Sequence, residues 1–265
     1  MRYWFHITRA HFTAEFITLL RYPFDLASMY VIVTLLLAGI FLGVYAFVPA
    51  GHVIGETMAA VYVGYIFWTF YVLTVSQASW RIKTAADKGY IERELLTPAG
   101  HGATVVAKIF ATSATGLLHY AAISVICALI FRIKLAVDVP SILFILLFCY
   151  IFLAGLGLTF AGLTLVFKRV GNLLSVTQIV LMVLSFAALG SYHSAAEAAL
   201  SWFPYTHSIR LLRAVLVEGE SFSHILKTGN VVPLAAGSVA FFAAGLLAFR
   251  QLDRAAMNRG LIGQF

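Results

Sequence analysis

The stretch Leu26–Phe47, LASMYVIVTLLLAGIFLGVYAF, carries no charged residue and is long enough to cross a lipid bilayer as a helix. A hydrocarbon core about 30 Å thick requires about 20 apolar residues of α-helix. Five further apolar stretches of similar length follow it: Met58–Trp80, Val105–Phe131, Ser141–Phe167, Leu173–Ser191 and Val231–Leu252. A soluble protein of 265 residues cannot cover so much apolar surface. The sequence therefore predicts an all-α membrane protein with six transmembrane helices.

The composition supports this interpretation. Hydrophobic residues make up 62% of the sequence and charged residues 11%, whereas a typical soluble domain has about 25% charged residues. The longest interval between apolar stretches, Tyr192–Asn230, is too short for a separate soluble domain. We therefore expect residues 1–265 to form a single transmembrane domain of a multi-pass protein in the cell (inner) membrane.

The positive charge is unevenly distributed. The formal net charge is +7, and thirteen of the 18 Lys and Arg residues lie in the N-terminus, the second and fourth connections and the C-terminal tail: Arg2, Arg9, Arg21, Arg81, Lys83, Lys88, Arg93, Lys108, Lys168, Arg169, Arg250, Arg254 and Arg259. Because Lys and Arg accumulate on the cytoplasmic side of membrane proteins, both termini are predicted to be cytoplasmic. This asymmetry accounts for the charge, and no nucleic-acid partner is expected.

Residues 1–22 precede the first span and have a helical pattern. Phe5, Phe12, Phe16 and Leu19 fall on one helix face, which predicts an amphipathic helix lying in the membrane interface. Pro23 is expected to end this helix and turn the chain into the bilayer. A solvated leader without fixed structure is the alternative interpretation.

The segment Arg81–Pro98, RIKTAADKGYIERELLTP, has the densest charge in the sequence. Helix-forming residues occupy Thr84–Lys88 and Tyr90–Leu96, with Gly89 between them and Pro98 at the end. The pattern predicts one short cytoplasmic helix, or two with a break at Gly89. Such a helix between two spans is suited to contact a soluble partner subunit, although an ordinary positively charged loop gives the same pattern.

The segment 192–230 before the last span has two short apolar stretches with helical character. Ala195–Trp202 and Ser208–Val217 are both too short to cross a bilayer, and Phe203-Pro204 separates them. Short apolar helices at membrane depth are tolerated where protein or a water cavity covers them. We expect two outer re-entrant or interfacial helices here.

Several chemical functions lack their sequence signatures. The chain has no G-x-x-x-x-G-K-[ST] phosphate loop, no H-E-x-x-H motif and no clustered Cys and His residues, so it is not expected to be an enzyme or to hold a metal. The predicted spans are nearly free of acidic residues, which argues against an internal proton or sodium relay. His119, near the middle of the third span, is the best candidate for such a relay, and a hydrogen-bonded packing role is the alternative.

Aromatic residues form a stripe in the second span. Tyr65, Trp68 and Tyr71 follow one another at intervals of three near its middle, away from the interfaces where aromatic residues usually gather. Together with His119 they are candidates for a substrate path that takes an amphipathic drug, a lipid or a glycan. Helix packing or lipid contact is the alternative explanation.

Two motifs resemble those of one transporter family. The run Gly89–Pro98, GYIERELLTP, is similar to the motif G-x-hydrophobic-E-x-x-L-x-[ST]-P that follows the second span in the membrane subunits of type 2 ABC exporters. Phe203–His207, with Arg213 downstream, resembles that family's N-P-hydrophobic-T stretch. Glu94 stands where the family usually has an apolar residue, and Phe203 replaces the usual Asn.

The resemblance implies a mechanism and partners. Two permease subunits, identical or related, would pair, and two ATP-binding subunits would dock on the cytoplasmic side and carry the ATP and Mg. The segment around Gly89–Pro98 would be the coupling helix, with Glu92 and Arg93 bonding to the ATPase. The residues implied in coupling are Gly89, Ile91, Glu92, Arg93, Leu95, Leu96, Thr97 and Pro98. A stand-alone channel or secondary carrier is the alternative function.

Overall fold

The computed structural model describes residues 2–47, 54–90, 101–167, 170–187, 203–227 and 231–260, and these residues form helices joined by short connections, without a strand. The helices are α1 (Arg2–Arg21), α2 (Pro23–Phe47), α3 (Ile54–Tyr71), η1 (Val72–Ser76), α4 (Gln77–Asp87), α6 (His101–Ile130), α7 (Val139–Phe167), α8 (Gly171–Ala187), α10 (Pro204–Leu216), α11 (Phe222–Lys227) and α12 (Val231–Asn258).

Five of these helical segments are long and apolar enough to cross a membrane. They are Pro23–Ala46, Thr57–Ala85, Gly102–Ile130, Val139–Phe167 and Val231–Asn258, and they coincide with five of the six predicted spans. The prediction of an all-helical membrane protein is confirmed. The remaining predicted span, Leu173–Ser191, corresponds to α8, which is a shorter apolar helix over Gly171–Phe186. The end of that predicted span lies outside the described residues.

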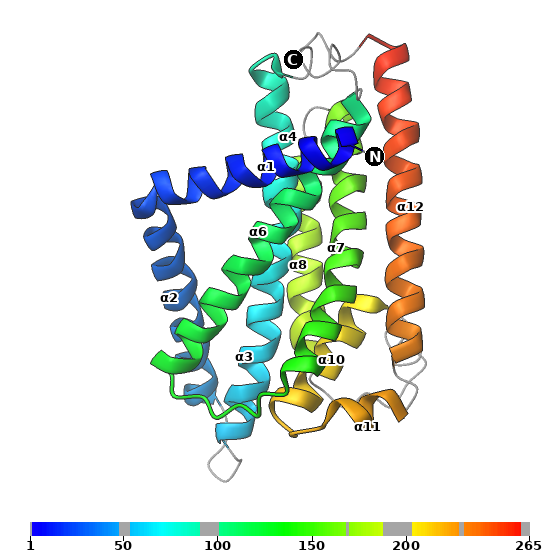
Figure 1. Cartoon of the computed structure of the whole chain (residues 1–265). Helices are drawn as coiled ribbons and strands as arrows, with labels where there is room; N and C mark the ends of the chain where they lie inside the picture. The colour runs from blue at the N-terminus through cyan, green and yellow to red at the C-terminus, as the bar shows by residue number, and fades with distance from the viewer. Residues whose placement is uncertain are drawn as a thin grey trace.

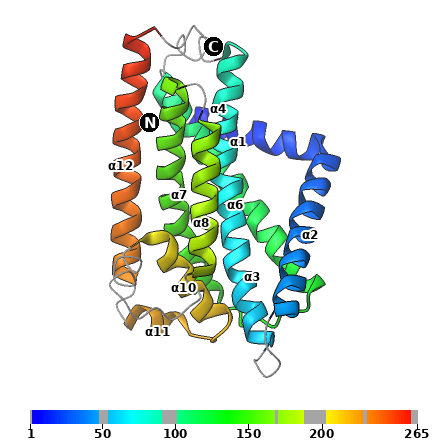
Figure 2. The ribbon, with the colours of Figure 1, turned by 180° about the vertical axis from the view of Figure 1, so that it is seen from behind.

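Helix α1 lies across one end of the bundle, nearly at right angles to the long helices (Figure 1). The C-terminal ends of α4 and α12 are at the same end, whereas α10 and α11 lie at the opposite end, as the view from behind also shows (Figure 2). The predicted helix in residues 1–22 is present, and it ends just before Pro23. Phe12 and Phe16 on its predicted apolar face are exposed, which suits a helix resting against lipid.

The second span is one long helix that contains a π-helical turn. α3, η1 and α4 follow one another without interruption. In the most apolar 18-residue stretch of Thr57–Ala85, 78% of the residues are buried. The residues Arg81–Asp87 therefore belong to the end of this helix and do not form a separate short helix. The helix continues because Ile82 and Ala85 pack against Val105 and Ile109 of α6.

The long helix turns at the predicted break. Gly89 has a φ of +67°, a left-handed conformation that glycine adopts without the steric cost other residues have. A Cβ atom at this position would meet no atom within 4 Å. The requirement for glycine here is therefore conformational, and the prediction of a break at Gly89 is confirmed.

The second predicted outer helix is α10. It begins four residues before the predicted Ser208, because Pro204 fits the first helical turn, where its missing N–H is not needed. Tyr205, Ile209 and Leu212 are buried against the bundle. The other predicted outer helix, Ala195–Trp202, lies outside the described residues. The six-residue helix α11 was not predicted, since it is too short to show a period.

Helices α7 and α12 approach each other at glycine residues. A Cβ atom added at Gly155 would lie 2.7 Å from the Cα of Phe242, and one added at Gly245 would lie 2.1 Å from the carbonyl oxygen of Gly155. Gly162 of α7 makes a similar close approach, since a Cβ there would lie 2.9 Å from the Leu252 side chain of α12. These contacts fix α12 against α7 at the level of the backbone.

Candidate functional site

The predicted coupling segment is described only up to residue 90. Lys88 and Gly89 form the turn after α4. The other residues implied in coupling lie outside the described residues: Ile91, Glu92, Arg93, Leu95, Leu96, Thr97 and Pro98. The structure therefore defines the helix that leads into this segment and the groups that hold that helix.

An ion pair connects α1 to the end of the long second helix. Nη1 of Arg81 donates to Oε1 of Glu15 at 2.5 Å, and the hydroxyl of Thr112 on α6 donates to the same oxygen at 3.4 Å. Glu15 is 7% exposed, whereas the Arg81 side chain is 34% exposed. This carboxylate thus joins three helices at the end of the bundle where the coupling segment begins.

Burial dominates the electrostatics of Glu15. Desolvation raises the pKa of its carboxyl group, and the attraction of Arg81 and the hydrogen bond from Thr112 oppose this shift without cancelling it. The pair lies beside a cavity of about 130 Å³ that Gln77 and His119 also line. Polar side chains from α1, α4 and α6 therefore meet around one cavity near the predicted cytoplasmic surface.

The π-helical turn η1 adjoins this cavity through Leu73. Gly116 of α6 packs closely on it, since a Cβ at Gly116 would lie 3.1 Å from the Thr74 hydroxyl and 3.4 Å from the Leu73 carbonyl oxygen. Nε2 of Gln178 on α8 donates to the Ser76 hydroxyl at 2.7 Å. Single π-helical turns within α-helices are frequent at functional sites.

The predicted aromatic stripe lies inside the helical bundle. The Tyr65 hydroxyl donates to the Val33 carbonyl of α2 at 2.7 Å, and Nε1 of Trp68 donates to the Gln178 carbonyl of α8 at 3.1 Å. Tyr71 is fully buried, and its hydroxyl has no hydrogen-bond partner among the described residues. This geometry joins α3 to its neighbours and fits the packing alternative, and the role of these residues in a substrate path stays a prediction.

His119 connects α6 to α2. Its Nδ1 lies 2.9 Å from the Tyr30 hydroxyl, and the two rings meet edge to face with centroids 5.9 Å apart. This contact gives the histidine the hydrogen-bonded position expected of a packing residue. His119 also lines the cavity beside Glu15 and Arg81, so the structure brings it together with charged groups that the sequence did not connect to it.

The contribution of Glu15 was not predicted. It is the single acidic residue in the first 22 residues, in a segment that is otherwise basic and apolar. It is buried, whereas Phe12 and Phe16 on the same helix are exposed. A lone acid on the inward face of an interfacial helix was the available signal, but its partner Arg81 is distant in the sequence.

These features define a class: a multi-helix membrane protein with an interfacial N-terminal helix and a charged turn after a central, buried span. Residues 55–247 match the family model described as ABC-2 family transporter protein, and the chain belongs to this family. Searches of curated proteins and of solved structures gave no match. The chain is thus the membrane component of an ABC transporter, a kind of subunit that typically has no catalytic site of its own.

Proposed function

We propose that the chain is the permease subunit of an ATP-driven ABC exporter and forms half of the path for an amphipathic or hydrophobic substrate. Two copies of a separate ATP-binding subunit supply the energy and carry the ATP and Mg. A second permease subunit, the same chain or a related one, completes the path. The observation that carries this proposal is the family match over 55–247, which encloses the whole segment Arg81–Pro98.

The proposed topology has six spans with both termini in the cytoplasm. The positions of three elements support this topology. α1, the end of α4 and the C-terminal end of α12 all lie at one end of the bundle (Figure 1). The same end holds most of the Lys and Arg residues, which mark the cytoplasmic side. α8 and the residues that follow it supply the fifth span in this topology.

The proposed mechanism is a rigid-body switch. When two ATP-binding subunits close on ATP, they move the segment Gly89–Pro98 that they hold, with Glu92 and Arg93 bonding to the ATPase and Leu95 packing into it. The uninterrupted helix from α3 to α4 carries this motion into the membrane, since Tyr65 and Trp68 connect it to α2 and α8. Such a switch needs two discrete arrangements of packed helices, biased by the nucleotide.

The ion pair between Glu15 and Arg81 gives α1 a part in this mechanism. Arg81 lies on the helix that leads into the coupling segment, and α1 continues directly into α2. A displacement of α4 is therefore passed to the first span through α1. We propose that α1 braces the coupling region against the membrane surface.

The direct test is the ATPase activity of the purified complex of this chain with its ATP-binding subunit. Glu92→Ala and Leu95→Ala should each weaken coupling, so that substrate no longer stimulates ATP hydrolysis. Lys88→Ala is the matched control, because Lys88 is an exposed cation just before the motif. Unchanged stimulation in both coupling variants, or transport by the chain alone in vesicles, would contradict the proposal.

A second variant pair tests the substrate path. Trp68→Leu and Tyr71→Leu should change the stimulation of ATP hydrolysis by substrate if the aromatic stripe contacts the cargo. If stimulation is unchanged while thermal stability falls, the stripe serves only to pack α3 against its neighbours. Other residues would then have to contact the substrate and determine its class.

A further inference from the structure

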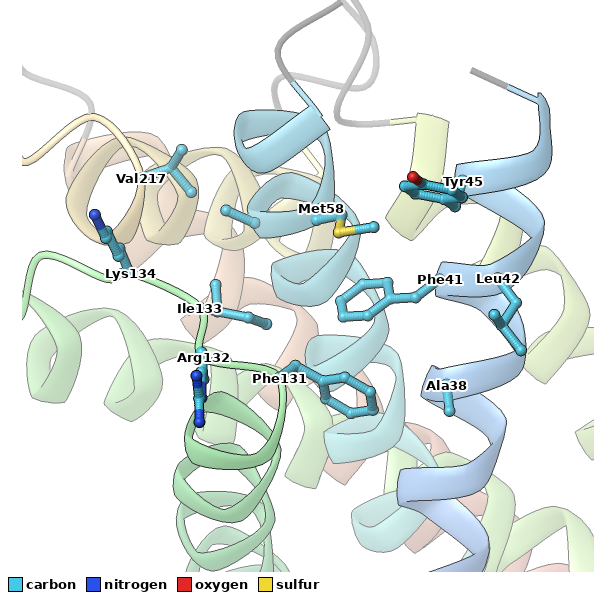
Figure 3. Close-up of a pocket in the computed structure, with 11 residues that line it drawn as sticks. Ala38, Phe41, Leu42, Tyr45, Met58, Phe131, Arg132, Ile133, Lys134 and Val217 are labelled. Carbon is cyan, nitrogen blue, oxygen red and sulfur yellow. The ribbon is translucent and has the colours of Figure 1, made fainter. Parts of the chain in front are cut away.

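A cavity of about 800 Å³ lies between α2, the start of α3 and the connection that follows α6 (Figure 3). It is at the end of the bundle that holds α10 and α11, opposite α1 (Figure 1). Its volume falls within the range of about 300–1,000 Å³ that is typical of ligand sites. In the proposed topology it opens near the outer surface of the membrane.

The cavity has apolar walls. The rings of Phe41 and Phe131 meet edge to face with centroids 5.0 Å apart, and Phe41 is buried. Leu42 and Tyr45 on α2 also line the cavity, and they are 72% and 66% exposed. Because the surroundings of a membrane-spanning helix are lipid, hydrocarbon chains can reach the cavity from the side.

Two cations stand at one side of this apolar space. Arg132 and Lys134, in the connection after α6, line the cavity and are exposed, and none of the described residues that line it is acidic. Within the described part of the chain neither has an ion-pair partner. Apolar walls next to unpaired cations match a ligand with hydrocarbon chains and a negative headgroup.

The backbone at Arg132 is unusual for an arginine. The Ile133 N–H donates to the Ala128 carbonyl at 3.0 Å and the Arg132 N–H donates to the Leu129 carbonyl at 3.4 Å, which is the Schellman pattern at a helix C-terminus. Arg132 occupies the left-handed position of this motif, with a φ of +52°, where glycine is favoured. A strained backbone that carries a guanidinium indicates a use for the side chain.

Three hydrogen bonds hold the connection that bears the cations. The Ala136 N–H donates to the Leu216 carbonyl at the end of α10 at 2.9 Å. The Asp138 carboxylate accepts from the Phe222 N–H at 2.9 Å and from the Ser141 hydroxyl. The connection is therefore fixed at both α10 and α11, which keeps Arg132 and Lys134 beside the cavity.

We propose that this cavity binds an anionic phospholipid from the outer leaflet. Its phosphate lies between Arg132 and Lys134, and its acyl chains lie along Phe41, Leu42 and Phe131. Two cations, with no acid among the lining residues that the structure describes, favour a headgroup of net negative charge over a zwitterion. Binding requires neither ATP nor the ATP-binding subunit, so this proposal and the proposed function fail independently.

The test uses the full-length chain in nanodiscs of equal parts phosphatidylglycerol and phosphatidylcholine, with retained lipids identified by native mass spectrometry. The wild type should retain phosphatidylglycerol preferentially. The double variant Arg132→Gln/Lys134→Gln should lower the ratio of retained phosphatidylglycerol to phosphatidylcholine about tenfold, because it removes two charge-assisted contacts to phosphate. Lys227→Gln is the matched control, since Lys227 is an exposed cation on α11, at the same end of the bundle, and does not line the cavity.

A second variant separates binding from folding. Arg132→Gly suits the left-handed backbone and removes the guanidinium, so thermal stability should not fall while preference for phosphatidylglycerol does. Equal retention of both lipids by the wild type, or equal ratios in the double variant and Lys227→Gln, would overturn the proposal. A photoreactive residue in place of Leu42 should label lipid, and capture of a second copy of the chain there would instead assign the cavity to a subunit interface.

Discussion

Helices α2 and α12 both lie at the edge of the bundle, but they are attached in different ways. In the most apolar 18-residue stretch of each helix, only 11% of the residues of α2 and 17% of those of α12 are buried. α12 meets α7 backbone to backbone at Gly155 and Gly245. α2 is held to the bundle by side-chain hydrogen bonds, from Tyr65 to the Val33 carbonyl and between Tyr30 and His119.

Cavities also flank α2. The cavity of about 800 Å³ lies beside its outer end, and a second of about 210 Å³ lies between Tyr30 and Ile126 of α6. Close-packed interiors transmit strain, whereas a helix beside voids can shift without moving its neighbours. The comparison predicts that similar exposure does not mean similar freedom: α7 and α12 should move as one unit, whereas α2 should shift more easily.

The largest expected effect concerns the pair α7 and α12. Gly245→Ala places a methyl group 2.1 Å from the Gly155 carbonyl oxygen, so α7 and α12 must separate. We expect a loss of about 3 kcal/mol or more, at the upper end for an overpacked core, measured as thermal unfolding of the purified chain. Gly39→Ala in α2 is the control, because nothing lies within 4 Å of its added methyl group. Equal stability of the two variants would contradict the claim that α12 is packed more closely against the bundle than α2.

Breaking the ion pair that attaches α1 to the bundle should cause an intermediate loss of stability. Arg81→Gln leaves the buried Glu15 carboxylate without its cation and should cost about 1–3 kcal/mol. The double variant Glu15→Gln/Arg81→Gln should recover most of this loss, because no buried charge remains. If the double variant is no more stable than Arg81→Gln, the ion pair does not hold α1 in place.

The same pair predicts a pH dependence with a defined sign. Because burial raises the pKa of Glu15 in the folded chain, the folded state takes up a proton more readily than the unfolded state. The contribution of the Glu15 carboxyl group to stability is fully present below its pKa in the unfolded chain. This contribution is lost as the pH rises through its higher pKa in the folded chain. In Arg81→Gln the folded pKa should rise further, because the opposing attraction of Arg81 is gone. The loss should therefore start at the same pH but continue to higher pH and become larger, measured as the unfolding temperature against pH with Glu15→Gln as the reference.

The smallest expected effect concerns the attachment of α2. Tyr30→Phe and Tyr65→Phe each remove one hydrogen bond and should cost about 1 kcal/mol. Together they should broaden the distribution of distances between spin labels at exposed Leu35 on α2 and Leu129 on α6. Labels at Leu147 on α7 and Val239 on α12 provide the control pair and should show a narrow distribution in both proteins. Equal widths for the two label pairs would contradict the comparison.

The sequence was sufficient to predict five long apolar helices, because lipid imposes length and polarity on each crossing helix. It was also sufficient to predict the turn at Gly89. It was not sufficient for the end of the second span. Arg81 begins a charged run, which suggested a new element, but Ile82 and Ala85 keep a buried face against α6. Burial at two positions in a polar segment was too weak a signal to predict a continuous helix.

The side-chain contacts could not be predicted from the sequence, for a different reason. Glu15 and Arg81 are 66 positions apart, and Tyr30 and His119 are 89 positions apart, so no local pattern connects them. The cavity beside Arg132 likewise arises from parts of the chain that are distant in the sequence: α2, α3 and the connection after α6. Only the arrangement of the helices brings these groups together.

The most direct test of the central claim is site-specific photocrosslinking in native membranes. The account predicts that a photoreactive residue in place of Glu92 captures a protein whose peptides contain a G-x-x-x-x-G-K-[ST] phosphate loop, and that one in place of Lys227 does not. Capture of such a protein at position 227, or labelling of position 92 by a reagent confined to the outside, would contradict the assignment of Gly89–Pro98 as the contact with an ATP-binding subunit.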